Sequence, residues 1–470
     1  MSNGDHIDDP WSELSEASFV IGGEDQIAHT RARHSQRPSE EDGQRRLTED
    51  WRQCLADLHI RVGTLLKADT VSFLLGAGAS KEAGGPLIGE VPLELERRLI
   101  NDGIAGAERP VVRQWIKCFY VAAARACSSA ANVPVTREQI LARRKTLANA
   151  PQPLPVNYEN LLSQLHRWRA ALPREGGRLR LDAAPGVALT SATIDECLRR
   201  ATAGLAQLCQ LPTAGSPATA FEAYKDVLRK ILTRPLNLKR ASIFTLNYDT
   251  LVERAADAEG VVLIDGFVGT VRRVFRPESY DHDLYFPAET TEGRVHRLDR
   301  VIHLLKLHGS ITWVSEECEL DNPYGIRAYG DVPQSNSPLV IYPTPAKWGE
   351  SLGMPYAELL RRFSTTIVRP QCVLFVVGYG FGDDHICAIV RQALAIPSFT
   401  LVIVDPKPES EFVRHLRDRK DPRVWIFSGT TFGTFTGFVR RALPDLRDET
   451  IRREIMETHR ALAGGDETNA

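Results

Sequence analysis

The sequence lacks closely spaced cysteines. Its eight cysteines are scattered through 470 residues, and none forms a C-x-x-C pair. That distribution excludes a zinc ribbon and a disulfide framework, because both need cysteines grouped at short spacings. A long chain with so few cysteines is typical of a reducing compartment, so we expect a cytoplasmic protein without a metal site.

Long hydrophobic runs are also missing. The longest resemble Cys372–Val377, far short of the roughly 20 residues that a membrane-spanning helix needs. The N-terminus, MSNGDHIDDPWSEL, is acidic where a secretory signal peptide needs basic residues and then an apolar segment. We therefore expect neither secretion nor a membrane partner.

The chain has little net charge of either sign. Its formal net charge is −2, so no overall basic field favours nucleic acid, and we expect no direct nucleic-acid binding. The sequence also has no G-x-x-x-x-G-K-[ST] motif, so any ATP chemistry must come from a partner.

The most informative segment that is present is VSFLLGAGAS, from Val71 to Ser80. A short apolar strand that ends at a glycine turn is how a nucleotide-binding crossover begins. Glycine permits a tight turn and lets a phosphate approach the backbone, because no Cβ stands in the way. The segment therefore favours a nucleotide site, although such turns also occur in proteins that bind no nucleotide.

The apolar runs predict an α/β fold with a Rossmann-like, mainly parallel sheet. Their residues are apolar at nearly every position, which suits strands buried on both faces of a parallel sheet. The six predicted strands are residues 71–75, 242–246, 261–265, 301–307, 372–377 and 400–404.

The composition along the chain divides it into four parts. We expect a flexible N-terminal arm over residues 1–50, because this segment is polar and mixed in charge. A nucleotide-binding domain follows over 51–430, interrupted at about 88–240 by a helical insertion rich in leucine, alanine and arginine. Residues 431–470 are expected to form a helical tail. The aromatic stretch Phe427–Phe438 is expected to belong to the core.

A polar or glycine residue follows five of the predicted strands. In an open parallel sheet, ligands bind outside the carboxyl ends of the strands, so these residues are expected to meet at one edge. The pattern favours a dinucleotide site. The five residues are Gly76, Asn247, His308, Gly378 and Asp405.

The order of motifs resembles the sirtuin (silent information regulator) superfamily, and more narrowly the sirtuin-like proteins of prokaryotic anti-phage defence. The resemblance covers about 70–430, and its motifs are specific as an ordered set. The shared pieces are FLLGAGASKEAGGP, NYENLLSQL, TLNYDTLVE, KLHGSITW, IYPTPAKW and VVGYGFGDDHI.

The resemblance implies that the chain binds NAD⁺ and cleaves its nicotinamide–ribose bond. By position, Asn247 and His308 match the catalytic residues of the family, and Asp249 matches the acid that contacts the nicotinamide carboxamide. The residues that match the NAD-binding turns are Gly76, Ala77, Gly78 and Ser80 near the phosphate and ribose, and Gly378, Tyr379 and Asp405 near the adenosine.

Two departures from the family decide the expected reaction. Deacylating sirtuins carry four zinc-binding cysteines after the His-Gly element, but here only Cys318 lies between His308 and Cys372, so no zinc is expected. Their acidic-Phe-Arg element is replaced here by Gly84-Gly85-Pro86-Leu87-Ile88. We therefore expect an NAD⁺ hydrolase that depletes NAD in abortive infection. The alternatives are an NAD-dependent protein deacylase and a non-catalytic NAD- or ADP-ribose-sensing subunit.

The chemistry of cleavage suits these side chains. The bond breaks through an oxocarbenium-like centre, so the site must orient the ribose and admit water. A neutral imidazole can take a proton from water or a ribose hydroxyl, and an amide can hold both. The resemblance also implies a homo-oligomer, or a companion such as a HerA-type ATPase or an Argonaute-like protein.

Plainer roles stay open for several of these residues. His308 can simply cap a strand end, and Asn247 can form a turn. Asp249 can cap the following helix, and Asp405 can be a turn residue. We expect Asp383 to cap a helix rather than bind a ligand.

Overall fold

The computed structural model describes most of the chain. The described residues are 9–106, 108–126, 133–154, 156, 158–173, 177–179, 189–287, 295–333 and 355–447. The motif IYPTPAKW at 341–348 and the end of the predicted tail, 448–470, lie outside them. None of the described helices is long and apolar enough to cross a membrane.

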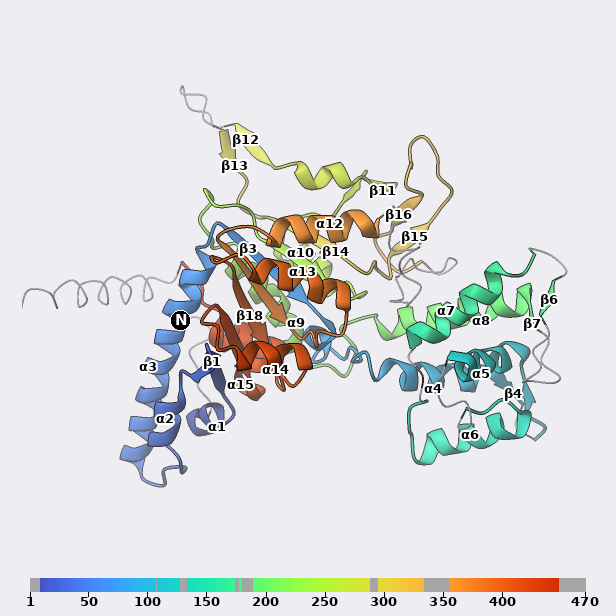
Figure 1. The fold of residues 1–470 in the computed structure, drawn as a ribbon, viewed down its shortest axis with the longest axis horizontal. Coiled ribbons are helices and arrows are strands. Elements are labelled where there is room, and N and C mark those ends of the chain that lie inside the picture. The colour runs from blue at the N-terminus through green and yellow to red at the C-terminus, as the bar shows by residue number, and fades with distance from the viewer. Residues whose placement is uncertain are drawn as a thin grey trace, which may run out of the picture.

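A mainly parallel sheet forms the centre of the molecule (Figure 1). In the described residues it has nine strands, and every neighbouring pair from β19 to β9 is parallel. The predicted fold class, α/β with a Rossmann-like, mainly parallel sheet, is confirmed. In spatial order the strands are β2 (Glu24–Asp25), β1 (Ser18–Ile21), β19 (Val424–Ser428), β18 (Thr400–Val404), β17 (Cys372–Val377), β3 (Thr70–Leu75), β8 (Ser242–Thr245), β14 (Val301–Lys306) and β9 (Val262–Ile264).

The sheet is buried on both faces, which explains the continuous apolar runs. Along β3, Val71, Phe73 and Leu75 pack into one core and Leu74 into the other, because successive side chains point to opposite faces. The helices of the first face are α3 (Glu41–Leu66), α9 (Ala218–Ile231), α10 (Leu251–Glu259), α15 (Gly429–Gly433) and α16 (Phe435–Gly437), with the π-helical turn η4 (Phe438–Ala442). Those of the second face are α12 (Tyr356–Ile367), α13 (Asp384–Leu394) and α14 (Glu411–Asp418).

A small antiparallel sheet extends the second face. Its strands are β10 (Phe267–Val268), β11 (Arg273–Phe275), β16 (Ile326–Ala328) and β15 (Trp313–Ser315). The 3-10 turn η3 (Pro277–Asp281) follows β11, and a hairpin of β12 (Tyr285–Pro287) and β13 (Val295–Arg297) projects beyond it (Figure 1).

The expected flexible arm does not hold for residues 9–50. This segment forms α1 (Pro10–Ser15), α2 (Ala28–Arg33) and the antiparallel strand β1, and α3 begins within it. Phe19 on β1 pairs with Phe427 on β19, and the two rings stack 4.4 Å apart. A few buried apolar side chains in a polar segment are enough to dock it, because they cover the last parallel strand of the sheet.

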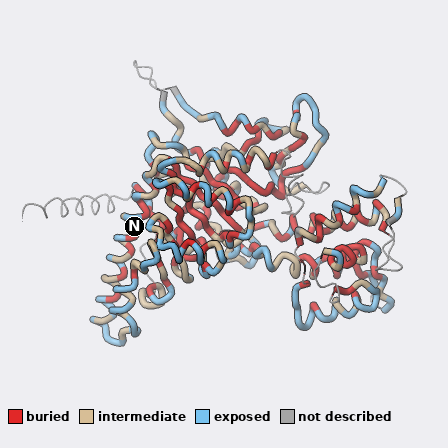
Figure 2. The backbone as a smooth tube through the Cα atoms, viewed as in Figure 1, coloured by how far each residue is buried: buried red, intermediate tan, exposed pale blue. Residues whose placement is uncertain are grey.

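The helical insertion forms a lobe beside the sheet (Figure 1). Its own core is distinct from the two cores of the sheet, as the second cluster of buried residues in Figure 2 shows. The lobe is smaller than the predicted 88–240, because α9 packs under the sheet instead. Its elements are α4 (Val91–Gly103), β4 (Ile104–Ala105), β5 (Val111–Val112), α5 (Gln114–Ala126), α6 (Arg137–Asn149), α7 (Tyr158–Ala170), β6 (Arg178–Leu179), β7 (Leu189–Thr190) and α8 (Ser191–Leu208).

The chain leaves the sheet for the lobe and returns to it side by side. The backbone N–H of Thr213 donates to the carbonyl of Ala83 at 3.1 Å, and Gly85 lies against Ser80 and Leu211. The lobe is therefore attached through a narrow, paired neck.

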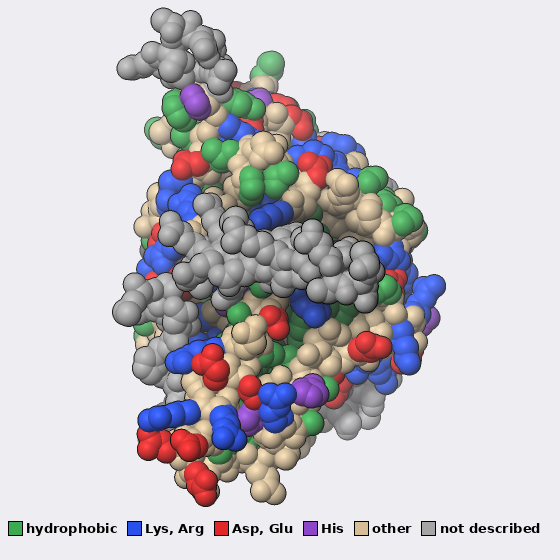
Figure 3. Space-filling model, turned by 90° about the vertical axis from the view of Figure 1, so that its left-hand side faces the viewer, with side chains coloured by type: hydrophobic (Ala, Val, Ile, Leu, Met, Phe, Trp, Pro, Cys, Tyr) green, Lys and Arg blue, Asp and Glu red, His purple; other side chains and the backbone are tan. Residues whose placement is uncertain are grey.

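The surface carries charges of both signs. On the face shown in Figure 3, basic and acidic side chains lie interspersed over the coloured part. That pattern agrees with the formal net charge of −2.

Candidate active site

Five neighbouring strands end at the edge where the predicted residues lie. In the order β18, β17, β3, β8, β14, these strands are followed by Asp405, Gly378, Gly76, Asn247 and His308. The chain runs outward from β3 through β8 in one direction and from β17 through β18 in the other. The strand order thus reverses between β3 and β17, which is where open α/β sheets form their ligand crevice.

The two glycine turns meet at this reversal point. The N–H of Gly78 donates to the carbonyl of Gly378 at 2.8 Å. A Cβ on Gly76 would lie 2.6 Å from the Gly378 oxygen, and Gly378 itself has φ +64°. Glycine is therefore needed here so that two backbones can touch. The Gly78 N–H, predicted to face a phosphate, is already occupied by a protein carbonyl.

Ser80 is buried at the end of the 3-10 turn η1 (Ala77–Ser80) and joins three elements. Its Oγ donates to Asp249 Oδ2 at 2.6 Å and accepts from Asn247 Nδ2 at 2.9 Å. The Tyr224 hydroxyl of α9 lies 3.2 Å from the same oxygen. One hydroxyl offers one donor and two acceptor positions, so these contacts use its full capacity. In this arrangement Ser80 holds the site together rather than presenting a free group.

Asn247 keeps one polar atom available. Its Nδ2 donates to the carbonyl of Gly76 at 2.9 Å as well as to Ser80, so both amide hydrogens are used. Its backbone N–H donates to Thr245 Oγ1 at 3.0 Å. Among the described residues, none bonds to Oδ1. The amide is therefore held in one orientation with its oxygen ready to accept from water or a hydroxyl.

Asp249 has both carboxylate oxygens engaged. Oδ1 accepts from the N–H of Leu251, at the start of α10, and Oδ2 accepts from Ser80. Asp249 is not the N-cap of α10, because Thr250 holds that position and no side chain caps the helix, so its bond to Leu251 is a turn contact before the helix. A contact with a carboxamide would have to share these oxygens.

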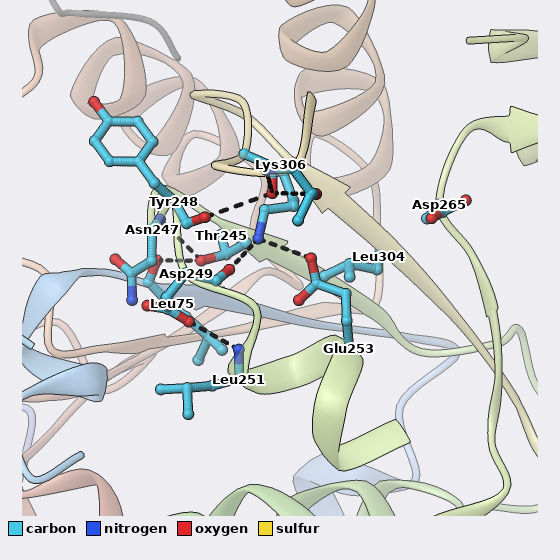
Figure 4. A network of polar contacts seen from close by, with 12 residues as sticks. Leu75, Thr245, Asn247, Tyr248, Asp249, Leu251, Glu253, Asp265, Leu304 and Lys306 are labelled. Carbon is cyan, nitrogen blue, oxygen red and sulfur yellow. Dashed lines mark hydrogen bonds and ion pairs between the residues drawn. The ribbon is translucent and has the colours of Figure 1, made fainter. Parts of the chain in front are cut away.

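An ion pair between a buried lysine and a partly buried glutamate supports the loop that carries Asn247 and Asp249 (Figure 4). Lys306, on β14, is 4% exposed at its side chain, and its ammonium donates to the Asp249 carbonyl and to Glu253 Oε1, the latter at 2.9 Å. Burial raises the pKa of Glu253, while Lys306 acts in the opposite direction. The strand that ends at His308 is thereby tied to the loop after β8.

His308 faces a carboxylate from the far side of the sheet edge. Its Nε2 lies 3.4 Å from Asp383 Oδ2, and the two side chains are 11% and 13% exposed. Asp383 also caps α13, as predicted, because its Oδ1 accepts from the N–H of His385 at 2.9 Å. Tyr379 braces the turn between them, since its hydroxyl accepts from the Asp383 N–H at 2.9 Å.

Two predicted residues make no side-chain contact with these clusters among the described residues. Asp405 accepts from the Lys407 N–H at 2.8 Å, which is a turn contact, and burial raises its pKa. The link to Gly378 is through the preceding residue, Val404 of β18, whose carbonyl accepts from the Gly378 N–H. Ala77 opens the turn η1.

Lys306, Glu253 and Tyr224 were not predicted. Lys306 had a signal, because it is the one lysine in strand 301–307, whose other residues apart from His303 are apolar. A lysine in such a strand must find buried partners. Glu253 and Tyr224 had none, since each sits on an amphipathic helix like many other polar residues.

No group of three metal-ligating side chains lies among the residues that the structure describes. The edge instead offers amide, hydroxyl, imidazole and carboxylate groups, which are ligands for polar organic molecules.

Comparisons with known proteins bear on part of the chain. Residues 241–424 match the family model described as the SIR2-like domain. No curated protein matches the chain. The matched residues include Asn247, His308 and Gly378, and the predicted resemblance to the sirtuin superfamily is confirmed there.

Solved structures give weaker similarities. One is a Sir2 homolog–NAD complex, with 13% identity, a TM-score of 0.35, and coverage of 84% of this chain and 93% of that chain. Another is a mutant of Sir2 homologues in complex with 2'-O-acetyl ADP ribose, with 14% identity, a TM-score of 0.32, and coverage of 83% and 98%. At these TM-scores the similarities add no weight to the family match.

Proposed function

We propose that this sirtuin-like protein, which contains a SIR2-like domain over residues 241–424, is an NAD⁺ hydrolase that releases nicotinamide and ADP-ribose. One observation carries the proposal. Asn247 and His308 follow adjacent parallel strands, so an oriented amide oxygen and an imidazole come to the same part of the sheet edge. Such a pair can hold and deprotonate a water molecule next to a ribose.

The edge fits a dinucleotide in part. The meeting of the two glycine turns lies at the reversal of strand order. Beside Gly380 and Gly382, an added Cβ would meet none of the described residues within 4 Å. The Gly78 N–H is the exception, because Gly378 takes it. The pyrophosphate contact is therefore better sought at the GYGFGD turn than at Gly78.

The reaction needs little from the protein beyond positioning. Breaking the nicotinamide–ribose bond sends its electron pair to the ring nitrogen, so nicotinamide leaves uncharged. The water oxygen bonds to the ribose carbon, and its proton goes to His308. Asn247 Oδ1 accepts the other hydrogen of the water and fixes its direction. A general base of this kind contributes about 10²- to 10⁴-fold in rate.

Purified protein incubated with NAD⁺ tests the proposal. We expect nicotinamide and ADP-ribose in equal amounts without any peptide. His308→Ala and Asn247→Ala should each lower the rate by about 10²-fold or more. His303→Gln, on the same strand as His308, is the matched control and should keep the wild-type rate at pH 7.5.

Two outcomes contradict the proposal. Turnover that requires an acylated peptide identifies a deacylase. Binding of NAD⁺ without turnover, unchanged by either alanine variant, identifies a sensor subunit.

The wider role implied by the resemblance belongs to the same proposal. It is depletion of NAD in the cytoplasm during phage infection, by a homo-oligomer or with a HerA-type or Argonaute-like companion. Its test is the cellular NAD concentration after infection, with the wild-type chain and with His308→Ala.

A further inference from the structure

Asp383 and His308 are brought together from strands that are not neighbours. His308 follows β14, while Asp383 follows β17, and β3 and β8 lie between these strands in the sheet. The carboxylate nevertheless approaches Nε2 to 3.4 Å, so the contact passes over the ends of the two intervening strands. Those strands deliver Gly76 and Asn247, so the pair frames the candidate site.

The position of Asp383 is fixed by contacts that do not involve His308. Oδ1 accepts from the His385 N–H, and the backbone N–H of Asp383 donates to the Tyr379 hydroxyl. Phe381, inside the same turn, has φ +56°, a left-handed conformation that is unfavourable for a bulky residue. Such strain at a turn is held by its surroundings and is found at functional sites. Oδ2 is thereby aimed at the imidazole.

We infer that Asp383 is a positioning residue that holds His308 in the tautomer required for the hydrolysis of NAD⁺. The inference rests on the proposed function. A carboxylate facing Nε2 favours the proton on that nitrogen, which leaves the lone pair on Nδ1. Nδ1 then takes the proton from the attacking water. Asp383 accepts no proton, and its negative charge stabilises the imidazolium that forms.

Other ionisable groups surround the pair. Asp384 lies next to Asp383 on α13 and is exposed. Burial raises the pKa of Tyr379 and of Cys387, so both are neutral near pH 7. The loop after β8 adds the carboxylate of Asp249 to the ionisable groups at this edge of the sheet.

On the histidine's own strand, Lys306 is paired with Glu253, and its ammonium also bonds to the Asp249 carbonyl. Asp383 is thus the carboxylate whose Oδ2 directly faces the imidazole, and its removal should change the titration of His308.

Asp383→Asn separates the proposed role from helix capping. Asparagine caps helices as well as aspartate does, so α13 should keep its start, while the charge is lost. We expect kcat for NAD⁺ hydrolysis to fall by about 10- to 100-fold, with KM little changed. The acid limb of the kcat/KM profile should move to lower pH by about one unit, because a lost anion disfavours the imidazolium.

Asp384→Asn is the matched control, because it removes an exposed carboxylate from the next position of the same turn. It should leave kcat and the pH profile as in the wild type. Asp383→Ser, which also caps, should reproduce the loss seen in Asp383→Asn. The inference is overturned if Asp383→Asn and Asp384→Asn lower kcat equally, or if Asp383→Asn keeps the wild-type pH profile of kcat/KM.

Failure of the proposed function can be recognised separately. Turnover that is lost in His308→Ala and retained in Asp383→Asn contradicts only the inference. If the wild type does not turn over NAD⁺, nitrogen NMR of His308 tests the contact directly, with His308→Gln assigning the signal. If the pKa of His308 is then the same in the wild type and in Asp383→Asn, the inference about Asp383 is overturned.

Discussion

Gly378 is the residue at which the backbone of the site is most constrained. Its φ is +64°, and an added Cβ would lie 2.2 Å from the backbone nitrogen of Ala79. Both the conformation and the contact oppose any other side chain. The two glycine turns therefore depend on this position for their approach.

Gly378→Ala should lower the free energy of unfolding by about 1–3 kcal/mol and weaken the binding of NAD⁺. Gly380→Ala is the control for stability alone, because a Cβ there would meet none of the described residues within 4 Å. Chemical denaturation and calorimetric titration with NAD⁺ measure the two effects. A Gly378→Ala protein as stable as Gly380→Ala would show that the turns can separate without cost.

At single residues, the sequence predicted which side chains reach the sheet edge better than it predicted their contacts. The glycines, Asn247 and His308 lie at that edge because each follows a recognisable strand. Ser80 was expected to touch NAD⁺, yet its hydroxyl is used by Asp249 and Tyr224, 169 and 144 residues away in the chain. Motif spacing cannot reveal such partners, because the tertiary fold alone brings them together.

At the scale of one strand, β14 contains a histidine that should make the fold sensitive to acid. Burial and the nearby Arg240 lower the pKa of His303 to about 4, while Asp283 opposes them. The unfolded chain therefore binds the proton more readily. Stability is full above pH 6.5 and falls as the pH drops from 6.5 towards 4, by up to about 3 kcal/mol.

His303→Gln should make this acid loss of stability shallower, and His29→Gln, at an exposed position of α2, should not. Urea unfolding at several pH values between 4 and 7 gives the comparison. Identical slopes in all three proteins would mean that His303 is not the responsible group.

The same strand carries the ion pair of Lys306 and Glu253. Lys306→Met leaves a carboxylate without its partner and should lower the free energy of unfolding by about 3 kcal/mol. The double variant Lys306→Met, Glu253→Leu should regain much of that stability, since it removes both charges. Equal stability of the single and double variants, measured by urea unfolding, contradicts this account.

Strand prediction succeeded where both faces of a strand are buried. Five of the six predicted strands are apolar at most positions because they pack between two layers. The edge strand β9 is the exception, since Val262 is 42% exposed. β19 and β1 were missed although each contains a short apolar run, Val424–Phe427 and Phe19–Ile21. Ile21 and Trp425 on these strands are only partly buried, and β1 is an antiparallel strand within a segment that is otherwise polar and mixed in charge.

At the scale of the whole molecule, the lobe should be separable from the sheet. Its elements share their own core, and the neck at Ala83 and Thr213 brings the two connections together. Replacing residues 87–209 by a short glycine–serine linker should leave a protein that still unfolds cooperatively. Its circular dichroism spectrum should remain that of a mixed α/β protein. The measurement is thermal unfolding followed by circular dichroism. Non-cooperative unfolding would mean that the sheet needs the lobe, against whose core Tyr248 packs.

The parallel sheet itself was predictable, but the neighbours of each strand were not. Apolar runs separated by helical segments indicate parallel strands and crossovers. Nothing in those runs states that β3 lies between β8 and β17. That order arises from packing, and it sets which strand ends share the site.

The pairing of β3 with β17 has a consequence for synthesis. Val71 pairs with Val373, and Gly78 bonds to Gly378. A growing chain acquires Ser80, Asn247 and His308 in that order, and the turn that meets Gly78 and carries Asp383 leaves the ribosome after all of them. The site therefore stays open at one side through most of translation. Under the proposed function, unfinished chains therefore lack the carboxylate that faces His308.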